Sequence, residues 1–500
     1  MVWRCDSCGK SFKQKGHFMK HLQQNTPCKS VTQSVESKVI EGKIQEKINE
    51  LEIGDIEVIN QNSNIEYINE IYSSNNSIRE KIANYLISTE KDKHNYDEYL
   101  TPPVLVDKLI SKIPPNILNT PKKFYEPCVG KGSILLGLFD SLFNSLENYC
   151  EDIIERCRII IEECLYFSDI NYSNIIVVKE LLLLHAQSYC GLRLNCKINY
   201  YCGDSLNLDI KSVWDISSFD CIISNPPFNV RQSKTKNKGG GNSLWKKFVL
   251  KSVNNWVIEG GYIIMIHPNG WRKPSSPGSK YNGLFKLLTE ENQMIYLSMN
   301  DIQKGKETFN CSTNYDWYIV HKKKKYKSTH VNDWKNHDNN IDMLEWDFLP
   351  NYNISRIYEL LSRDDFENCN ILYDRSKYGG EQKWVGYKKD DIFKYPLIHN
   401  TSKKGTIYHY SSLNDNGHFG IGKVIFGDSG IYNSILDTKG EFGMTHHSMA
   451  IIDDEDILPL IKEVIDSKAF GDILKSCSWS TYQIDWRLFL YFRKDFWKYV

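Results

Sequence analysis

The chain has 500 residues, of which 41% are hydrophobic, 25% charged and 13% aromatic, a composition typical of an ordered globular protein with roughly two to four domains. Lys+Arg and Asp+Glu are equal at 62 each, so net charge gives no support for a nucleic-acid partner, which would have to meet local basic patches. The sequence has neither an apolar run of about 18 residues nor a signal-peptide pattern, which predicts a soluble, intracellular protein that is not secreted and makes no membrane contact.

Four potential metal ligands open the chain with the spacing Cys-x2-Cys-x12-His-x6-Cys. Zn²⁺ prefers tetrahedral sulfur and nitrogen ligands, so we predict one structural zinc ion held by Cys5, Cys8, His21 and Cys28. With Phe12 and Phe18 at the small apolar positions, the segment resembles the C2H2 zinc-finger family, although it ends in a cysteine and the last gap is longer than usual. The resemblance implies a ββα finger over residues 1–30.

The same resemblance implies which finger residues would face DNA bases, namely Gln14, His17 and Lys20. One finger covers only about 3 bp and binds weakly alone, so docking of another protein is an alternative role for it. The following residues, 31–95, are polar and rich in Ser, Asn, Glu and Lys. We expect them to form a linker with short helices over 39–51 and 78–87.

Strand-like and helix-like segments alternate from residue 96 to residue 330. We predict strands over 123–128, 164–168, 198–202, 219–224 and 262–266, a helix from Ser133, an inserted helix over 148–161, an apolar helix through 181–184 and a helix capped by Ser243. Such alternation predicts a doubly wound α/β sheet. Two further strands, over 293–298 and 316–321, are expected to end the sheet as an antiparallel pair.

Residues 341–500 differ in character and predict a separate α+β domain. The segment 404–453 is rich in Gly, Asn and Asp between short β-branched and aromatic runs. A helix is expected over 457–474, and the aromatic residues that follow Trp479 are assigned to a hydrophobic core.

A loop with two glycines follows the first predicted strand and reads Glu126-Pro127-Cys128-Val129-Gly130-Lys131-Gly132. It has the spacing of neither a phosphate-binding P-loop nor G-x-G-x-x-G, but glycines there let a ligand approach the backbone. The pattern acidic-Pro-x-x-Gly-x-Gly resembles the loop that binds S-adenosylmethionine (SAM). The resemblance implies that Gly130 and Gly132 lie against SAM, that Glu126 meets its ammonium group, that Asp169 binds its ribose hydroxyls and that Asp204 lies near its adenine amino group.

Asn225-Pro226-Pro227-Phe228 closes the strand predicted over 219–224. Two prolines fix the backbone and remove two N–H donors, so the carbonyl of Pro226 is left as an acceptor beside the side-chain oxygen of Asn225. Phe228 adds a flat face at the same place. Together they suit an exocyclic amino group, such as N6 of an adenine turned out of its helix, and at this point the chain resembles the SAM-dependent amino-methyltransferases.

Tyr99-Leu100-Thr101-Pro102-Pro103, upstream of the glycine loop, resembles the additional N-terminal motif of the γ-class N6-adenine DNA methyltransferases. In that family Asn-Pro-Pro-aromatic follows the glycine loop, and a target-recognition domain comes last. The resemblance implies a site-specific adenine methyltransferase that acts on double-stranded DNA as a monomer, with a catalytic domain over 96–330 and target recognition over 341–500. It also implies that Thr101 contributes to the cofactor site and that Phe309 backs the flipped base.

Two further segments are expected to contact DNA. The basic, glycine-rich residues 231–241 directly follow Phe228, and we expect Lys234, Lys236 and Lys238 to bind phosphates. Base reading is expected in the glycine-rich run 417–443, in turns that carry Lys423, Asn433 and Lys439.

Two other interpretations remain open. RNA and protein-glutamine methyltransferases also use Asn-Pro-Pro-aromatic, and an inactive zinc-finger DNA-binding adaptor could retain the fold. The Thr101-Pro102 motif and the long segment after the sheet favour DNA, and the intact Asn225, Gly130 and Gly132 argue against an inactive adaptor.

Overall fold

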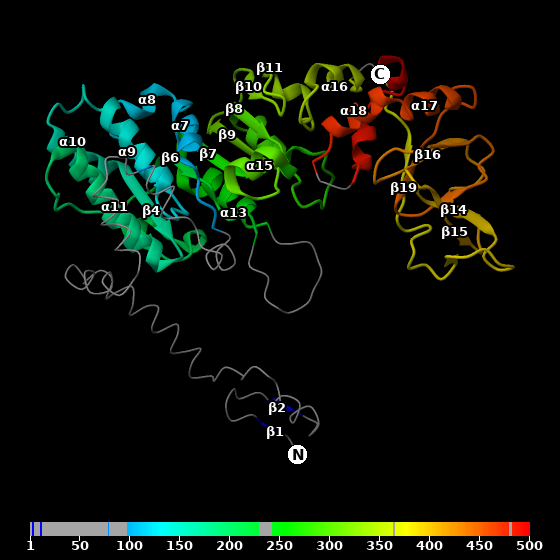
Figure 1. The fold of residues 1–500 in the computed structure, drawn as a ribbon, viewed down its shortest axis with the longest axis horizontal. Coiled ribbons are helices and arrows are strands. Elements are labelled where there is room, and N and C mark those ends of the chain that lie inside the picture. The colour runs from blue at the N-terminus through cyan, green and yellow to red at the C-terminus, as the bar shows by residue number, and fades with distance from the viewer. Residues whose placement is uncertain are drawn as a thin grey trace.

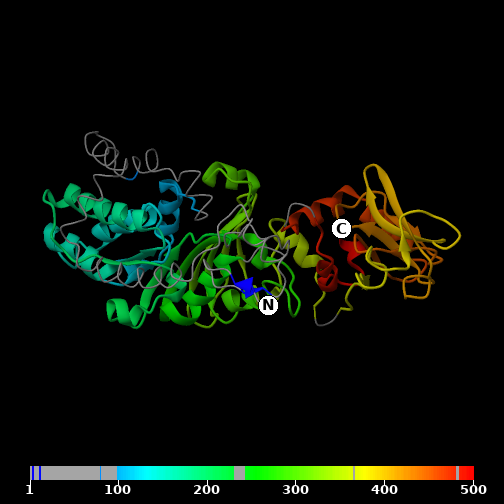
Figure 2. The ribbon, with the colours of Figure 1, turned by 90° about the horizontal axis from the view of Figure 1, so that it is seen from below.

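The computed structural model describes residues 3–4, 11–12, 79, 98–229, 243–363, 366–479 and 483–500. A sheet domain with flanking helices, coloured cyan to green, and a C-terminal domain, coloured yellow to red, lie end to end along the longest axis (Figures 1 and 2). Within these ranges, no helix combines the length and the apolar character needed to cross a membrane.

Several predicted sites lie outside the described residues and stay predictions. They are the zinc ligands Cys5, Cys8, His21 and Cys28, the finger residues Gln14, His17 and Lys20, the linker helix over 39–51, and Lys234, Lys236 and Lys238. At the N-terminus the structure describes β1 (Trp3–Arg4) and β2 (Ser11–Phe12), an antiparallel pair such as a ββα finger would begin with. Among the described residues, no group of three or more His, Cys, Asp or Glu could hold a metal ion.

One nine-stranded sheet forms the centre of the larger domain, in the order β11-β10-β8-β9-β7-β6-β3-β4-β5. Its strands are β3 (Phe124–Glu126), β4 (Leu165–Asp169), β5 (Asn199–Cys202), β6 (Phe219–Ser224), β7 (Val257–Pro268), β8 (Gln293–Asn300), β9 (Tyr315–His321), β10 (Thr329–Asn332) and β11 (Asp338–Ile341). β3 pairs in parallel with β4 and β6, and β5 and β7 extend this parallel set on either side. The predicted α/β sheet is therefore confirmed.

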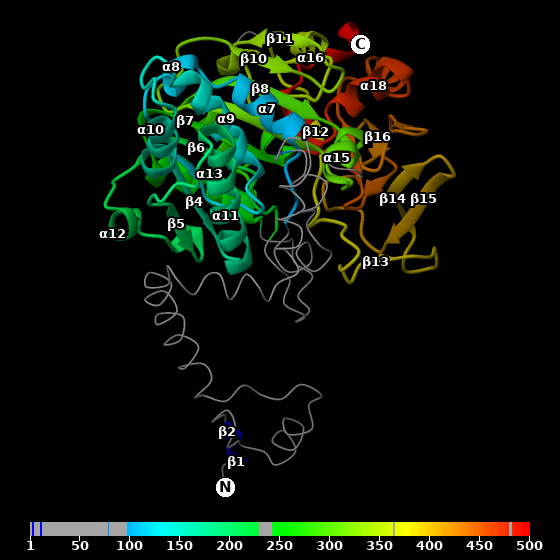
Figure 3. The same cartoon turned by 60° about the vertical axis from the view of Figure 1, so that its left-hand side comes forward.

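Helices cover both faces of this sheet, because its strands carry apolar side chains on both sides. Ile263 and Ile264 of β7 show the two-residue period of a strand, since they belong to the hydrophobic clusters on opposite faces. One face is covered by α7 (Pro103–Ser111), α9 (Ser133–Ser145), α10 (Ile153–Ile159) and α11 (Tyr172–Cys190), which gather together in Figure 3. The opposite face is covered by α13 (Leu244–Lys251) and α14 (Leu284–Thr289).

The structure differs from the predicted elements in three places. The sheet continues past the antiparallel pair of β8 and β9, because β10 pairs in parallel with β8 and β11 follows it, so the sheet domain reaches Ile341. The helix predicted over 457–474 is two helices, α17 (Leu458–Ile465) and α18 (Lys468–Ser476), since the Ser467 hydroxyl accepts the backbone N–H of Phe470 and starts a new helix. Ser243 precedes α13 as predicted, but its hydroxyl contacts Tyr281 instead of capping the helix.

The C-terminal domain contains two small sheets, with the orders β12-β19-β16-β17 and β13-β15-β14-β18. Their strands are β12 (Ile371–Leu372), β13 (Val385–Gly386), β14 (Tyr395–Ser402), β15 (Gly405–Ser411), β16 (Lys423–Gly427), β17 (Ile435–Asp437), β18 (Gly443–Met444) and β19 (Ser448–Ile451). Phe489, Phe492 and Phe496 are fully buried, which confirms the core assignment for these residues of the aromatic tail, whereas Tyr499 is exposed. The domain boundary is less sharp than predicted, because one hydrophobic cluster contains Leu297 of the sheet domain as well as Phe489.

A buried arginine joins the two domains. Arg272, which follows β7, has no solvent exposure and makes a bidentate contact to Asp316 of β9, with Nε 2.7 Å from Oδ2 and Nη2 3.1 Å from Oδ1. Its Nη1 donates to the carbonyl of Leu349 at 2.9 Å and its Nη2 to Asn351 Oδ1 at 2.9 Å. Asn351 in turn donates to the carbonyl of Ser478 at 2.7 Å. The end of β7 is thereby tied to the C-terminal domain.

We expect Arg272→Met to lower the free energy of unfolding by about 3–5 kcal/mol, because it leaves the Asp316 carboxylate buried without its partner. Chemical unfolding measures this, and adding Asp316→Asn should recover part of the loss. Lys211→Ala is the matched control, since it removes an exposed pair with Asp215 that contributes little. Equal losses in Arg272→Met and Lys211→Ala would contradict this role of the buried pair.

Candidate active site

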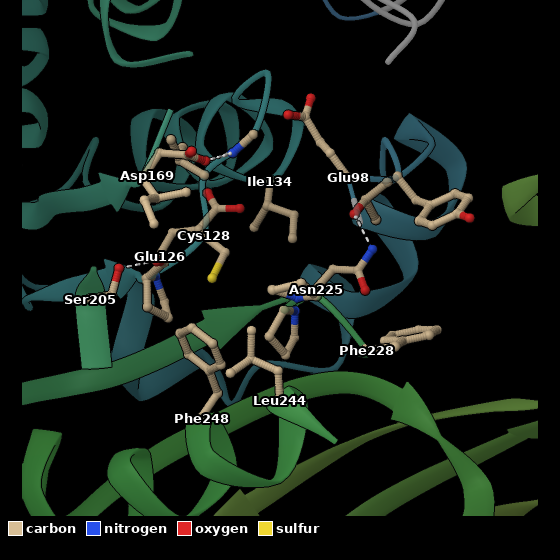
Figure 4. A pocket seen from close by; sticks show the side chains of 18 of the residues that line it. Glu98, Glu126, Cys128, Ile134, Asp169, Ser205, Asn225, Phe228, Leu244 and Phe248 are labelled. Carbon is tan, nitrogen blue, oxygen red and sulfur yellow. Dashed lines mark hydrogen bonds between the residues drawn. The ribbon is translucent and has the colours of Figure 1, made fainter. Parts of the chain in front are cut away.

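A cavity of about 310 Å³ lies at the edge of the sheet where parallel strands β3, β4 and β6 end, the usual ligand position in such sheets. Nearly all of the predicted site residues line it: Thr101, Glu126, Gly130, Asp169, Asp204, Asn225, Pro226, Pro227, Phe228 and Phe309. In Figure 4, Glu126, Asp169 and Ser205 lie on one side of the cavity, and Asn225 and Phe228 lie on the other. The tertiary structure thus brings the two predicted motifs to one site.

The glycines of the loop after β3 have different roles. Both have left-handed backbones, with φ of 51° at Gly130 and 82° at Gly132, which other residues adopt only with strain. Gly130 lines the cavity, and its N–H donates to Asp169 at 2.9 Å. Gly132 is not among the lining residues: it precedes α9, and a Cβ there would lie 3.1 Å from Val178 of α11. Gly132 therefore allows close packing behind the loop instead of lining the cavity.

Asp169 ends β4 and is nearly buried. Its Oδ2 accepts the Gly130 N–H at 2.9 Å and its Oδ1 accepts the Asn171 N–H at 2.7 Å. Burial raises the pKa of Asp169 to about 6, against the lowering effect of these two hydrogen bonds. Each carboxylate oxygen keeps a second lone pair with which it can accept a ligand hydroxyl.

Glu126 ends β3 and is the most isolated charge of the site. Its side chain is 2% exposed, and nothing in the described part of the chain hydrogen-bonds to its Oε2. Burial, and then the charge of Asp169, hold the pKa of Glu126 well above its usual range. A buried carboxylate oxygen without a donor is costly unless a cation or donor meets it.

Asp204 lines the cavity and also caps a short helical turn. Its Oδ1 accepts the Leu206 N–H at 3.0 Å and its Oδ2 accepts from Asn207 Nδ2 at 2.7 Å. The side chain is exposed. Part of its hydrogen-bonding capacity therefore serves the turn.

Sequence reasoning missed a polar cluster beside the glycine loop. Lys131 Nζ donates to Asn174 Oδ1 at 2.7 Å, and Asn174 Nδ2 donates to Glu98 Oε2 at 2.9 Å. Glu98 and Lys131 line the cavity. Asn174 gave no signal because it lies in a polar run, 171–174, that is typical of the start of a helix. Its partners become visible only when the helix packs against the loop.

Aromatic and apolar side chains surround the Asn-Pro-Pro-Phe turn. Phe228 is half-buried, and Leu244 and Phe248 of α13 line the cavity below it (Figure 4). Phe309 ends α15 (Ile302–Phe309), is buried, and packs edge-to-face on Tyr315 with ring centroids 5.0 Å apart. The cavity therefore has flat apolar walls beside the Asn225 amide.

A second cavity, of about 800 Å³, lies between the sheet domain and the C-terminal domain. Ser312, Thr313 and Asn314 line it from the sheet side, directly after the residues Phe309 and Cys311 that line the first cavity. From the C-terminal side it is lined by Tyr373, Asp374, Arg375, Asp428, Met449, Trp479, Gln483, Ile484, Asp485, Trp486 and Arg487. The segment 309–314 thus separates the two cavities.

The prediction that Lys423 reads bases is wrong. Lys423 lies in β16 with no solvent exposure, and its Nζ is 2.7 Å from Asp437 Oδ2 and 2.9 Å from the carbonyl of His418. It stabilises the small sheet and cannot reach a base. Asn433 and Lys439 are exposed.

Part of the chain that contains this site matches a known protein family. Residues 163–309 match the family described as Eco57I restriction-modification methylase. The match contains Asp169, Asn225 and Phe309 but begins after the glycine loop. No curated protein matches the chain.

Several solved structures are similar at low identity. A modification subunit of a putative type I restriction enzyme from Vibrio vulnificus is 14% identical, covers 51% of each chain and has a TM-score of 0.36. A putative class I SAM-dependent methyltransferase from Listeria monocytogenes is 15% identical over 53% of this chain and 74% of that one, with a TM-score of 0.35. The type IIL restriction-modification enzyme MmeI, in complex with DNA, is 10% identical over 82% and 69%, with a TM-score of 0.49. The matched region spans only about half of the length of the Vibrio subunit.

We expect Glu126→Gln to stabilise the ligand-free protein at pH 7.5. A carboxyl group whose pKa is raised by folding lowers the free energy of unfolding once the pH exceeds its pKa in the unfolded chain. Gln removes the ionisable group and keeps an oxygen for the Leu135 N–H. The gain should shrink as the pH falls toward the ordinary pKa of a glutamate, below which the carboxyl group is protonated in the unfolded chain as well as in the folded one. Thermal unfolding across this range measures it, and an unfolding midpoint lowered at pH 7.5 would contradict it.

Proposed function

We propose that this chain transfers a methyl group from SAM to N6 of an adenine turned out of double-stranded DNA. The observation that carries the proposal is that Asn225 and Phe228 line the same cavity as Gly130, Glu126 and Asp169. A turn suited to an amino group and a set of carboxylates suited to a cationic nucleoside cofactor thus face one space. The restriction-modification methylase match supports DNA as the substrate.

The residues present fit SAM. Its ammonium group would meet Glu126 Oε2, the buried oxygen without a donor, and its ribose hydroxyls would use the remaining lone pairs of Asp169. The exposed edge of Asp204 would lie near the cofactor's adenine, between the apolar side chains of Ile170 and Leu206 that line the same cavity. When bound, SAM supplies a methyl group on a positively charged sulfur.

The chain's own contribution to the reaction is positioning. The lone pair of adenine N6 is delocalised into the ring, so the nitrogen is a poor nucleophile. The Asn225 side-chain oxygen and the Pro226 carbonyl would accept its two hydrogens, turn it toward tetrahedral geometry and direct the lone pair at the methyl carbon. With SAM bound, the methyl group would reach the nitrogen that Asn225 and Pro226 hold, and the proton that N6 gives up would leave to water.

The aromatic walls would hold the flipped base. Phe228 would stack on its ring and Phe309 would back it from the other side, and stacking of this kind contributes about 1–3 kcal/mol per base. Pro227 fixes the turn that connects Asn225 to Phe228. The predicted phosphate contacts of Lys234, Lys236 and Lys238 belong to the segment that directly follows.

We further propose that the C-terminal domain chooses the methylated sequence. The second cavity supports this, because it lies between the domains next to the segment 309–314 and is large enough for several base-edge contacts. Tyr373 and Trp486 stack there with ring centroids 5.2 Å apart, and Arg487 reaches Ser276 of the sheet domain at 3.1 Å. A reading surface held in this way keeps a constant distance from the flipped base.

The test of the function is incubation with adenine-containing duplex DNA and labelled SAM, followed by analysis of the nucleosides. We expect N6-methyladenine from the natural chain and a rate about 10²–10³ lower from Asn225→Ala, because one preorganised acceptor is lost. Calorimetry should give nearly the same SAM affinity for both proteins. Label found only in RNA or in protein glutamine would establish the alternative substrates, and no transfer to any of them would favour the inactive adaptor.

A second prediction distinguishes the role of the N-terminal finger from that of the C-terminal domain. Deleting residues 1–30 should lower DNA affinity and leave the methylated motif unchanged, because a single finger on a linker of about 65 residues sets no register for the active site. Arg79 contacts Asp107 at 2.7 Å, so the linker meets the sheet domain at that position. Sequencing of DNA methylated by the truncated protein measures the motif. A changed motif would assign site selection to the finger.

A further inference from the structure

A hydrogen bond links two residues that are 124 positions apart. Nδ2 of Asn225 donates to Oγ1 of Thr101 at 3.2 Å, and this contact appears in Figure 4 as the dashed line at Asn225. Thr101 is 5% exposed. Within the described ranges, this is the hydrogen bond that the Asn225 side chain makes, so its Oδ1 is left to face a ligand.

The backbone of Thr101, which carries this hydroxyl, is held in place on both sides. The carbonyl of Thr101 accepts the Ser133 hydroxyl at 2.6 Å, which fixes it to the first residue of α9. On its other side Pro102 restricts Thr101 to extended backbone, and the Pro102 carbonyl accepts the N–H of Leu105 and of Val106 in α7. The Thr101 backbone therefore stays in place, and its hydroxyl gives the Asn225 amide a hydrogen-bond partner at a fixed position.

The direction of the amide decides whether Asn225 can receive an amino group. An asparagine amide has two donors at one end and an acceptor at the other. An exocyclic amino group offers only hydrogens to a partner in the plane of its ring, so it needs Oδ1. If the amide turned over, donors would face donors, and an unmade hydrogen bond would remain in a closed site.

We propose that Thr101 is a positioning residue whose hydroxyl holds the Asn225 amide in place, so that its Oδ1 can accept the amino group of the target base. The inference rests on the proposed function and deepens it, because it gives Thr101 a role other than the cofactor contact that the sequence motif implies. Thr101 lines the cavity, but its hydroxyl is engaged with Asn225. The role requires a hydroxyl at this position and no contact between that hydroxyl and SAM.

The matched variants are Thr101→Val, which keeps the shape and removes the hydroxyl, and Thr101→Ser, which keeps the hydroxyl. With saturating SAM and duplex DNA, we expect Thr101→Val to lower kcat about tenfold, the effect of one hydrogen bond of ordinary strength. Thr101→Ser should restore most of the rate. The Kd for S-adenosylhomocysteine, measured by calorimetry, should change less than about twofold in either variant.

A measurement without catalysis completes the test. In protein labelled with ¹⁵N-asparagine, the side-chain amide signal of Asn225 is the one lost in Asn225→Ala. We expect this signal to shift in Thr101→Val and to stay near its natural position in Thr101→Ser.

The contrary outcomes are distinct. A higher Kd for S-adenosylhomocysteine with unchanged kcat in Thr101→Val would show that Thr101 acts in the cofactor site. An equal loss of kcat in Thr101→Val and Thr101→Ser would assign the effect to packing of the methyl group. An unmoved Asn225 signal in Thr101→Val would also overturn the proposal. Failure of the natural chain to methylate DNA would reject the proposed function instead, and the amide signal would still decide whether Thr101 holds Asn225.

Discussion

The site depends on one constraint: β3, β4 and β6 are neighbours and run in parallel. Parallel strands end at the same edge of a sheet, so the residues at their carboxyl ends must gather there. Glu126, Asp169 and Asn225 occupy these three ends, although they are far apart in the chain. Burial raises the pKa of both carboxyl groups, and the charge of Asp169 raises the pKa of Glu126 further. The carboxyl ends of these strands thus hold two buried carboxyl groups, whose ionised forms a bound cation would stabilise, beside the Asn225 amide.

A second buried contact connects the sheet domain to the C-terminal domain. The Arg272–Asp316 pair is fully buried, and Arg272 also satisfies the carbonyl of Leu349 and the amide of Asn351. Such pairs are costly to desolvate and contribute little net stability when compared with apolar residues, but they specify geometry. Here the geometry is the position of the C-terminal domain relative to β7, and therefore the width of the cavity between the domains. Under the proposed function, the C-terminal domain must be held at a constant distance from the modified base, and this contact can do that.

Local patterns in the sequence predicted most of the sheet domain correctly. Apolar runs that end in polar residues placed β3 to β7 within a few residues, because a buried parallel strand needs apolar side chains on both faces. The inserted helix before β4 was also predicted and is present as α10. The errors lie where local pattern carries no information about partners. β10 and β11 were missed because they are short and depend on pairing with β8, and Lys423 was taken for an exposed residue because its partner Asp437 lies on another strand.

By itself, the sequence predicted the chemical groups of the site: the glycine loop and the Asn-Pro-Pro-Phe turn are each contiguous, and each carboxylate directly ends its own apolar run, so their chemistry can be read from neighbouring residues. Only the tertiary structure decided how these groups face one another. It separated the two loop glycines, with Gly130 in the cavity and Gly132 packed against Val178. It also joined Thr101 to Asn225 and Lys131 to Asn174. Hydrogen bonds between distant residues depend on distances and angles that arise only when the helices pack on the sheet, and no local pattern records them.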